Sequence, residues 1–345
     1  MKEKVNQVRK SAGRERIKHA VFFMANWWHK NYGISFDKDY YFNADARFEI
    51  ERRMQGALYE RFGDIGLGSK DGKVTLSMDF ALPAALGCKV TFNSDMHPWI
   101  EPMNLGEKEI DGLTVPDFEV VYPTKNIPEQ VKRIEEKSGI YPGLWLDHWG
   151  IQNLALKIRG ESLLTDYYEN PGLAKKVLGF CAEAIYSFAT FANTLKKEPP
   201  NSYLSNAHCS VSLISPGTYA EHILPHDINL AGRFLSTGIH QDDAVKEIID
   251  YYARIPHLDI LQARDDSDWE KIAKLCPDIT VSVLCYQNRL MYRKPSAIEG
   301  EIKEIIKKVG YRFKKMEIAL TNIEYDAPDE NIRAAYRAIS DYNGS

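Results

Sequence analysis

Three β-rich segments of the sequence end in a side chain that could bind a metal ion. These side chains are Cys209, His240 and Cys285, which follow the segments 202–208, 233–239 and 279–284. A stretch with helical character follows each of them. Imidazole nitrogen and thiolate sulfur are common zinc ligands. If the segments are strands of a parallel barrel, their carboxyl ends meet on one face and the three residues can share a site.

Two neighbouring residues refine this hypothesis. Asp242 lies two positions after His240, so both side chains can turn toward one ion, although Asp242 could equally cap a helix that begins near residue 243. His208 and Cys209 are adjacent, so in an extended strand only one of them can face the site; we choose Cys209. Cys285 is also compatible with an ordinary buried thiol. The candidate metal ligands are His240, Asp242, Cys285 and Cys209.

The elements that must position these residues alternate along the chain. From about residue 128 on, strand-like stretches alternate with helix-like stretches of about 10–15 residues, which is typical of a parallel α/β sheet. No glycine-rich dinucleotide motif follows the first strand, so a closed (β/α)₈ TIM barrel is favoured over a doubly wound sheet. We expect one domain over residues 1–345, with a helical N-terminal extension (1–70) and an irregular excursion over the barrel (70–125).

Composition narrows the class of protein. The chain has 345 residues, is 44% hydrophobic and 27% charged, and carries a formal net charge of −4. These values are typical of a soluble globular protein and give no electrostatic reason to bind nucleic acid or a membrane. No apolar run approaches the roughly 20 residues that span a bilayer, and the first residues do not resemble a signal peptide. Five cysteines argue against a disulfide framework. We expect a cytoplasmic protein.

Several short motifs occur in the order and spacing of a known superfamily. They read WGIQNLALKIRGE, LTDYYENP, ISPGTY with LPHD, and APDENIRA, at residues 149–161, 164–171, 214–227 and 327–334. Together they resemble the uroporphyrinogen decarboxylase superfamily over roughly residues 140–340, and more weakly before that. The resemblance implies a (β/α)₈ barrel with an N-terminal helical extension. Members include porphyrinogen decarboxylases and zinc-dependent methyltransferases that work with corrinoid proteins.

Two regions distinguish between these branches. Porphyrinogen decarboxylases carry an Arg-Gln-Ala-Gly-Arg type motif that binds substrate carboxylates, whereas residues 22–29 here read FFMANWWH. Because arginine forks suit carboxylates, their absence implies a smaller or less charged substrate. The methyltransferase zinc motif usually reads His-X-Cys, with a further Cys near the last strand. This chain has His240-Gln241-Asp242 and, near the last strand, residues 321–324 without a cysteine, so Asp242 and Cys285 or Cys209 would have to complete the ligand set.

The resemblance implies a zinc-dependent methyltransferase that moves a methyl group from a small methylated donor to a corrinoid protein. An aromatic N-terminal segment is compatible with an O-methyl aromatic donor. The sequence has no Asp-X-His-X-X-Gly pattern for binding cobalamin, so the cobalamin would be carried by a partner protein. Two alternatives stay open. One is a metal-free decarboxylase or related lyase on the same barrel, and the other is a degenerate barrel that binds without catalysis.

Five residues are candidates for substrate binding. Each has a simpler interpretation: a tryptophan in the aromatic segment is more often part of the core, a histidine in a polar loop is often surface structure, and the acidic residues 265–268 could cap the next helix. The candidates are Asn26, Trp27, His97, Gln262 and Arg264.

Overall fold

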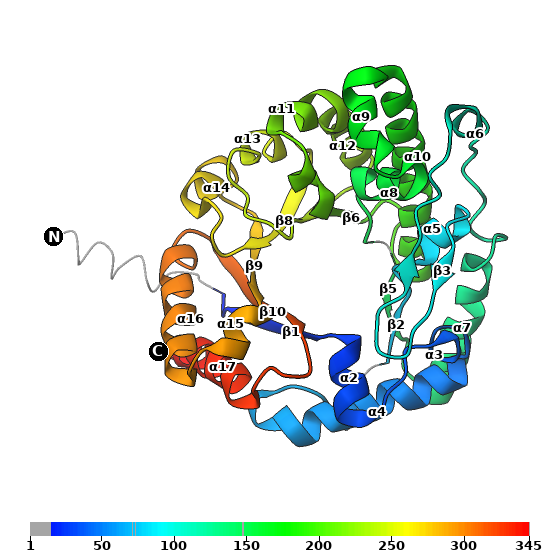
Figure 1. Ribbon diagram of the computed structural model, residues 1–345. Coiled ribbons are helices and arrows are strands. Elements are labelled where there is room, and N and C mark those ends of the chain that lie inside the picture. The colour runs from blue at the N-terminus through cyan, green and yellow to red at the C-terminus, as the bar shows by residue number, and fades with distance from the viewer. Residues whose placement is uncertain (1–14, 71, 73, 147, 345) are drawn as a thin grey trace. The chain divides into compact units, whose positions relative to one another are not determined.

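The computed structural model describes residues 15–70, 72, 74–146 and 148–344, and shows an α/β protein with parallel strands (Figure 1). The described chain divides into two compact units. Unit 1 contains residues 15–23, 241–253 and 259–344, and unit 2 contains residues 24–240 and 254–258. Each unit thus combines segments that are distant in the sequence.

Unit 1 is built on parallel strands in the order β1, β10, β9, β8. Their bounds are Lys18–Phe23 for β1, Lys315–Ile323 for β10, Thr280–Tyr286 for β9 and Leu258–Arg264 for β8. Val281, Val283 and Ile318 are completely buried, as expected for strands covered on both faces. The helices are α13 (Ile249–Tyr252), α14 (Trp269–Leu275), α15 (Gln287–Tyr292), α16 (Pro295–Val309) and α17 (Asp329–Gly344).

Unit 2 contains two parallel strand pairs and one short antiparallel pair. These are β6 (Leu204–Ala207) with β7 (Thr237–His240), β2 (Thr75–Ser77) with β5 (Gly143–Trp145), and β3 (Val90–Thr91) with β4 (Trp99–Ile100). Its longer helices are α2 (Ala25–Tyr32), α4 (Ala44–Phe62), α7 (Ile127–Ser138), α8 (Ile151–Arg159), α9 (Ser162–Glu169), α10 (Pro171–Leu195) and α12 (Leu224–Ala231).

Helix α10 shows how the sequence fixes one of these strands. Asn170 caps the helix and accepts a hydrogen bond from the backbone N–H of Leu173 at 3.3 Å, and Pro171 occupies the first turn, where no N–H is needed. Near the other end, the buried Asn193 amide donates to the carbonyls of Pro200 and Tyr203, at 2.9 Å each. These bonds tie the end of α10 to the segment that enters β6.

Much of the expected order is confirmed, including the α/β class, the parallel pairing and the strand–helix alternation after residue 128. The expected helical extension over residues 1–70 needs correction, because Lys18–Phe23 is a strand that pairs with β10. Its residues HAVFF favour extended structure. The helix expected over 243–253 is limited to Ile249–Tyr252. Closure into an eight-stranded barrel, and the single domain, stay predictions.

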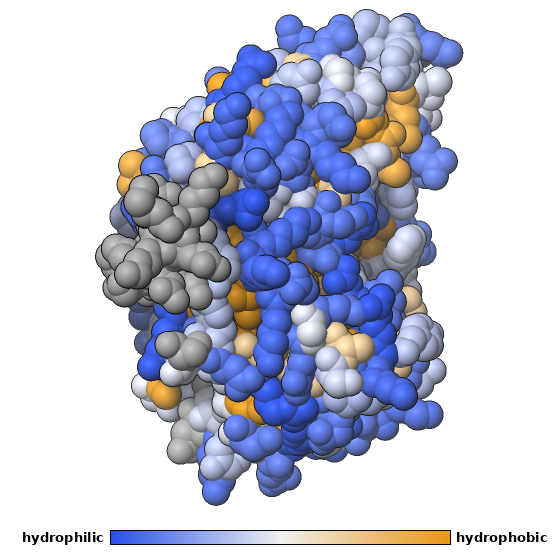
Figure 2. All heavy atoms as spheres, turned by 90° about the vertical axis from the view of Figure 1, so that its left-hand side faces the viewer, coloured by the Kyte–Doolittle hydropathy of each residue, from blue (hydrophilic) through white to orange (hydrophobic). Residues whose placement is uncertain are grey.

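Figure 2 shows one face on which hydrophilic residues predominate and hydrophobic side chains form small separate groups. Among the described residues, no helix combines the length and the apolar character needed to cross a membrane.

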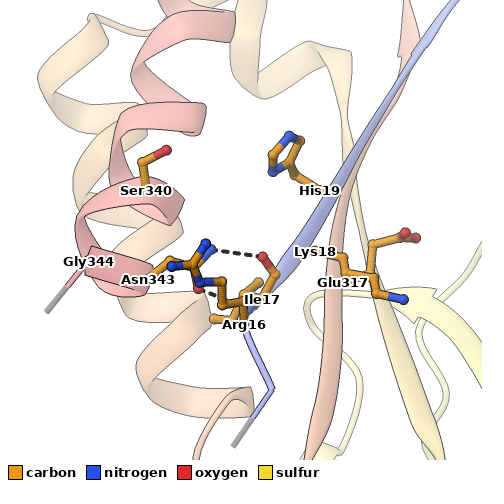
Figure 3. A pocket seen from close by; sticks show the side chains of 8 residues that line it. All are labelled: Arg16, Ile17, Lys18, His19, Glu317, Ser340, Asn343 and Gly344. Atoms are coloured by element: carbon orange, nitrogen blue, oxygen red, sulfur yellow. Dashed lines mark hydrogen bonds between the residues drawn. The ribbon is translucent and has the colours of Figure 1, made fainter. Parts of the chain in front are cut away.

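Unit 1 has a surface hollow of about 620 Å³ where β1 begins and α17 ends (Figure 3). Asn343 closes the end of α17 onto β1, since its side chain accepts from the Ile17 N–H at 2.9 Å and donates to the Ile17 carbonyl at 3.0 Å. Arg16, His19 and Glu317 also line the hollow. It lies at the amino ends of β1 and β10, whereas the candidate site residues follow carboxyl ends of strands.

Candidate metal centre

Cys209 and His240 come together because they follow neighbouring parallel strands of unit 2. Ala207 on β6 pairs with His240 on β7, and the His208 backbone N–H donates to the His240 carbonyl at 2.6 Å. A ligand atom of Cys209 and one of His240 lie within 4.8 Å of each other, and both side chains are half-buried. A thiol and an imidazole at this separation can reach one metal ion with small side-chain rotations.

The turn that carries Cys209 is fixed by helix α8. The Ser210 N–H donates to the side-chain oxygen of Asn153 at 2.9 Å, and the Gln152 amide donates to the Ser210 carbonyl at 2.8 Å. Gln152 and Asn153 belong to the WGIQNLALKIRGE motif. One function of this motif is therefore to hold the turn after β6, so that Cys209 keeps its position beside His240.

His208 lies in a buried polar cluster, as expected for the neighbour of a site residue on a strand. Its Nε2 is 3.4 Å from the Asp227 carboxylate, which also accepts hydrogen bonds from Asn206 at 3.0 Å and Tyr219 at 2.7 Å. Burial alone would raise the pKa of Asp227, but His208 and the two hydrogen bonds outweigh it and hold the pKa below its usual value. The choice of Cys209 over His208 agrees with this arrangement.

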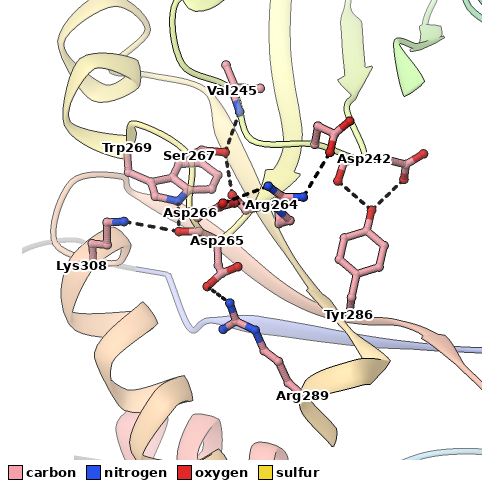
Figure 4. A network of polar contacts seen from close by, with 11 residues as sticks. Asp242, Val245, Arg264, Asp265, Asp266, Ser267, Trp269, Tyr286, Arg289 and Lys308 are labelled. Atoms are coloured by element: carbon pink, nitrogen blue, oxygen red, sulfur yellow. Dashed lines mark hydrogen bonds and ion pairs between the residues drawn. The ribbon is translucent and has the colours of Figure 1, made fainter. Parts of the chain in front are cut away.

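Asp242 belongs to unit 1, where Tyr286 holds it (Figure 4). The Tyr286 hydroxyl lies 2.8 Å from Oδ1 of Asp242 and 3.0 Å from its backbone carbonyl, and donates to them. The chain itself limits the separation of Asp242 from His240, since two residues span at most about 7 Å between Cα atoms.

His148 is a site residue that the sequence analysis missed. It follows β5, its Nδ1 lies 2.8 Å from the hydroxyl oxygen of Ser205, and its ring centre lies 4.8 Å from that of His240. The sequence carries the same signal as for His240, because the stretch GLWLD at residues 143–147 has strand character and His148 follows it. Applying the rule of a metal-binding residue at a strand end to this segment would have identified His148.

Cys285 lies in the packed interior of unit 1, which corrects its assignment as a metal ligand. Its side chain lines a small cavity with Leu290, Ile298 and Ile302, against the helices of unit 1. Burial raises the pKa of its thiol to about 12. Side chains alternate along a strand, and the neighbouring Tyr286 occupies the face that meets Asp242.

Replacing Cys285 by alanine should leave the metal content of the protein unchanged. It should lower the free energy of unfolding by about 1 kcal/mol, the usual cost of truncating a buried side chain. The matched variant Cys209→Ala should show the opposite pattern, with metal affinity lost and stability nearly retained. Metal analysis and denaturant unfolding of both variants make the comparison. Loss of metal from Cys285→Ala alone would restore Cys285 as a ligand.

The aromatic segment is mainly core. Trp27 is completely buried and packs against Trp28 and Phe62, with ring centres 4.8 and 6.4 Å away. Arg61 covers its ring, with the guanidinium carbon 5.0 Å from the ring centre. The assignment of Trp27 to substrate binding is therefore corrected. Asn26 lies on the same helix, and its side-chain oxygen is buried without a hydrogen-bond partner in the described structure, so it stays a candidate.

His97 is exposed beside Phe36, with ring centres 6.4 Å apart. It also influences Asp79, a residue that the sequence analysis did not select. Asp79 is exposed. Desolvation by the surrounding protein atoms raises the pKa of its carboxyl group, whereas the charges of His97 and Arg47 lower this pKa. An accessible carboxyl group with a raised pKa can serve as a proton donor.

Gln262 and Arg264 lie on β8 in unit 1. Gln262 accepts a backbone hydrogen bond from Gln241 at 2.9 Å, and its side chain keeps its candidate role. Arg264 is held by two carboxylates, Asp266 at 2.6 Å and Asp243 at 3.1 Å (Figure 4). Substrate binding by Arg264 would have to compete with these ion pairs.

Comparison with known proteins supports the fold. No family model and no curated protein sequence matches the chain. Among solved structures, the chain is similar to a methyltransferase from Methanosarcina mazei, with a TM-score of 0.69 and 16% sequence identity. The match covers 96% of this chain and 94% of the other. At this identity the likeness shows a shared fold.

Proposed function

We propose that this protein is a metal-dependent methyltransferase that moves a methyl group from a small methylated donor to a corrinoid carried by a partner protein. The observation that carries the proposal is the cluster of metal-binding side chains. Within unit 2, Cys209 and His240 offer ligand atoms within 4.8 Å of each other, and Asp242 follows His240 by two residues in the sequence. The fold shared with a methyltransferase and the superfamily motifs support the same conclusion.

The chemistry of the three side chains fits Zn²⁺. Thiolate, imidazole and carboxylate are all zinc ligands, and three protein ligands with one open position are typical of catalytic zinc sites. Asp242 stands where the related methyltransferases usually have a cysteine, and the Tyr286 hydrogen bond would orient its carboxylate. Partners of this kind fix the orientation of metal ligands.

The residues of the chain would bind and orient the donor. When bound, Zn²⁺ would supply Lewis acidity at the donor oxygen or nitrogen, which makes that atom a better leaving group. Cys209, His240 and Asp242 would hold the ion, leaving one position for the donor heteroatom. The methyl group would leave as a cation equivalent to an acceptor in the cob(I) state, and the donor heteroatom would take up a proton from water, so charge and atoms balance.

Metal analysis and a transfer assay test the proposal together. We expect about one zinc ion per chain after purification, as for a mononuclear catalytic site. Free cob(I)alamin serves as the acceptor, with methanol, methylamines and O-methyl aromatic compounds as donors, and methylcobalamin is followed by absorbance. Zinc-dependent formation of methylcobalamin is the expected result. A protein that binds no zinc and transfers no methyl group from any of these donors would overturn the proposal.

A metal-free lyase is the second candidate, and Asp79 favours it. A carboxyl group with a raised pKa could deliver a proton to the carbanion that a decarboxylation leaves. In this case the chain would catalyse decarboxylation without zinc, and Asp79→Asn would abolish the reaction. Zinc content thus separates the two candidates.

A further inference from the structure

We propose that His148 is a further ligand of the metal, and that it occupies the fourth coordination position while no substrate is bound. This inference rests on the proposed function and adds one residue to its metal site. His148 is not a position of the His-X-Cys motif that the sequence resembles, and it follows β5, whereas His240 ends β7. The inference depends on the position of His148 in unit 2.

The distance between the two imidazoles matches shared ligation. The ring centres of His148 and His240 lie 4.8 Å apart, with an angle of 65° between the ring planes. Two imidazoles on one tetrahedral zinc ion, each with a Zn–N distance of about 2.0–2.1 Å, have ring centres roughly 5 Å apart. His148 therefore needs only a small adjustment to bind the same ion as His240.

The hydrogen bond of His148 selects the nitrogen that would bind. Its Nδ1 lies 2.8 Å from the Ser205 hydroxyl oxygen. A histidine that binds a metal through one nitrogen usually donates a hydrogen bond from the other. With the proton on Nδ1, Ser205 would accept this bond and Nε2 would present its lone pair. Ser205 lies on β6, opposite Gly238 on β7, so the same two strands support Cys209, His240 and His148.

A close backbone contact fixes the segment that carries His148. Gly150 lies so near the end of β6 that an added Cβ would be 1.7 Å from the Ala207 carbonyl oxygen and 2.7 Å from its carbon. Any other residue would push the segment away from the strand. The close approach brings the end of β5 against the end of β6, which is where Cys209 begins its turn.

A fourth protein ligand has a consequence for the reaction. A zinc ion with four protein ligands has no free coordination position, whereas a catalytic zinc ion needs a position for the substrate or a water molecule. The donor heteroatom would therefore replace His148 Nε2. One coordination bond breaks and one forms, with no electron transfer. His148 would protect the metal from water until the donor arrives, and would remain beside it during transfer.

Cobalt substitution tests the role of His148 without relying on activity. Apoprotein of the wild type, His148→Ala, His240→Ala and the control His222→Ala would be titrated with Co²⁺, and affinity measured by competition with a chromophoric chelator. We expect His148→Ala to weaken Co²⁺ binding by at least about 10-fold. Loss of a residue that only hydrogen-bonds to a metal ligand already costs about 10–100-fold in metal affinity, and loss of a ligand should cost at least as much. Its visible absorption should shift, and added imidazole should restore the wild-type spectrum.

The variants separate failure of this inference from failure of the proposed site. If His240→Ala loses the metal while His148→Ala keeps wild-type affinity and spectrum, His148 is not a ligand and the proposed site stands. If the wild type binds neither Co²⁺ nor Zn²⁺, both proposals fall. Circular dichroism and thermal unfolding confirm that each variant is folded, and His222→Ala should match the wild type in Co²⁺ affinity and absorption spectrum.

Discussion

Replacing His240 by alanine is expected to remove the bound metal and methyl transfer while leaving the protein folded. His240 would supply the imidazole beside Cys209, and losing a direct ligand should lower zinc affinity by more than the roughly 10–100-fold that loss of an outer partner costs. The change should cost little stability, because the His240 side chain is only half-buried and its backbone carbonyl still accepts the bond from His208. Zinc content, methylcobalamin formation and thermal unfolding measure the three effects.

Asp242→Cys provides the complementary variant. It introduces the His-X-Cys arrangement of the zinc motif that the sequence resembles, and thiolate is a good zinc ligand, so zinc binding should be kept or tightened. It also removes the side-chain acceptor of the Tyr286 hydrogen bond, and any fall in activity with zinc retained would measure that contribution. Full zinc content and full activity in His240→Ala would disprove the zinc mechanism.

The sequence predicted those candidate site residues for which it shows where the strand ends and which side chains lie on the same face. The adjacency of His208 and Cys209 required one of them to point away, and the structure places His208 against Asp227. The strand before His240 was also recognised, with the observed strand starting later. In both cases the site residue is the last residue of the strand or follows it closely, so the backbone alone determines its position.

The assignment of Cys285 did not use the alternation of side chains along β9. Residues 279–284 read ITVSVL, so Thr280 and Ser282 alternate with apolar residues. Cys285 is in phase with Val281 and Val283, whereas Tyr286 is in phase with Thr280 and Ser282. In the structure Tyr286 contacts Asp242. His148 was missed for a different reason, because the rule of a metal-binding residue after a strand was not applied to residues 143–147, which precede it.

The N-terminal strand β1 was not expected from the sequence. Residues 18–23 lie beside a charged stretch and before a helix, so a long window gives a helical pattern. Pairing with β10 fixes the extended form, with Ala20 opposite Ala319 and Val21 opposite Leu320. This contact joins residues about 300 positions apart, so no local window of the sequence contains it.

Replacing Asp227 by asparagine should destabilise the protein more than any other single polar change considered above. The carboxylate is completely buried, and it accepts hydrogen bonds from Asn206 and Tyr219 and faces His208. Asparagine has nearly the same shape but no charge, and its amide group would meet donors. Removing one member of a buried charged cluster costs about 3–5 kcal/mol. Denaturant unfolding should show this loss, and zinc affinity should fall too, because Asn206 and His208 directly precede Cys209.

The effect of Asp227→Asn should depend on pH in a definite direction. The pKa of Asp227 is lower in the folded protein than its ordinary value of 3.8, so its ionised form stabilises the fold. This contribution is complete above about pH 4 and decreases as the pH falls through the lower folded pKa. The stability difference between wild type and variant should therefore be constant near neutral pH and shrink in strong acid. The exposed control Asp278→Asn should change stability by no more than about 0.5 kcal/mol. A difference that grows on acidification would show that Asp227 is not held in its charged form by His208, Asn206 and Tyr219.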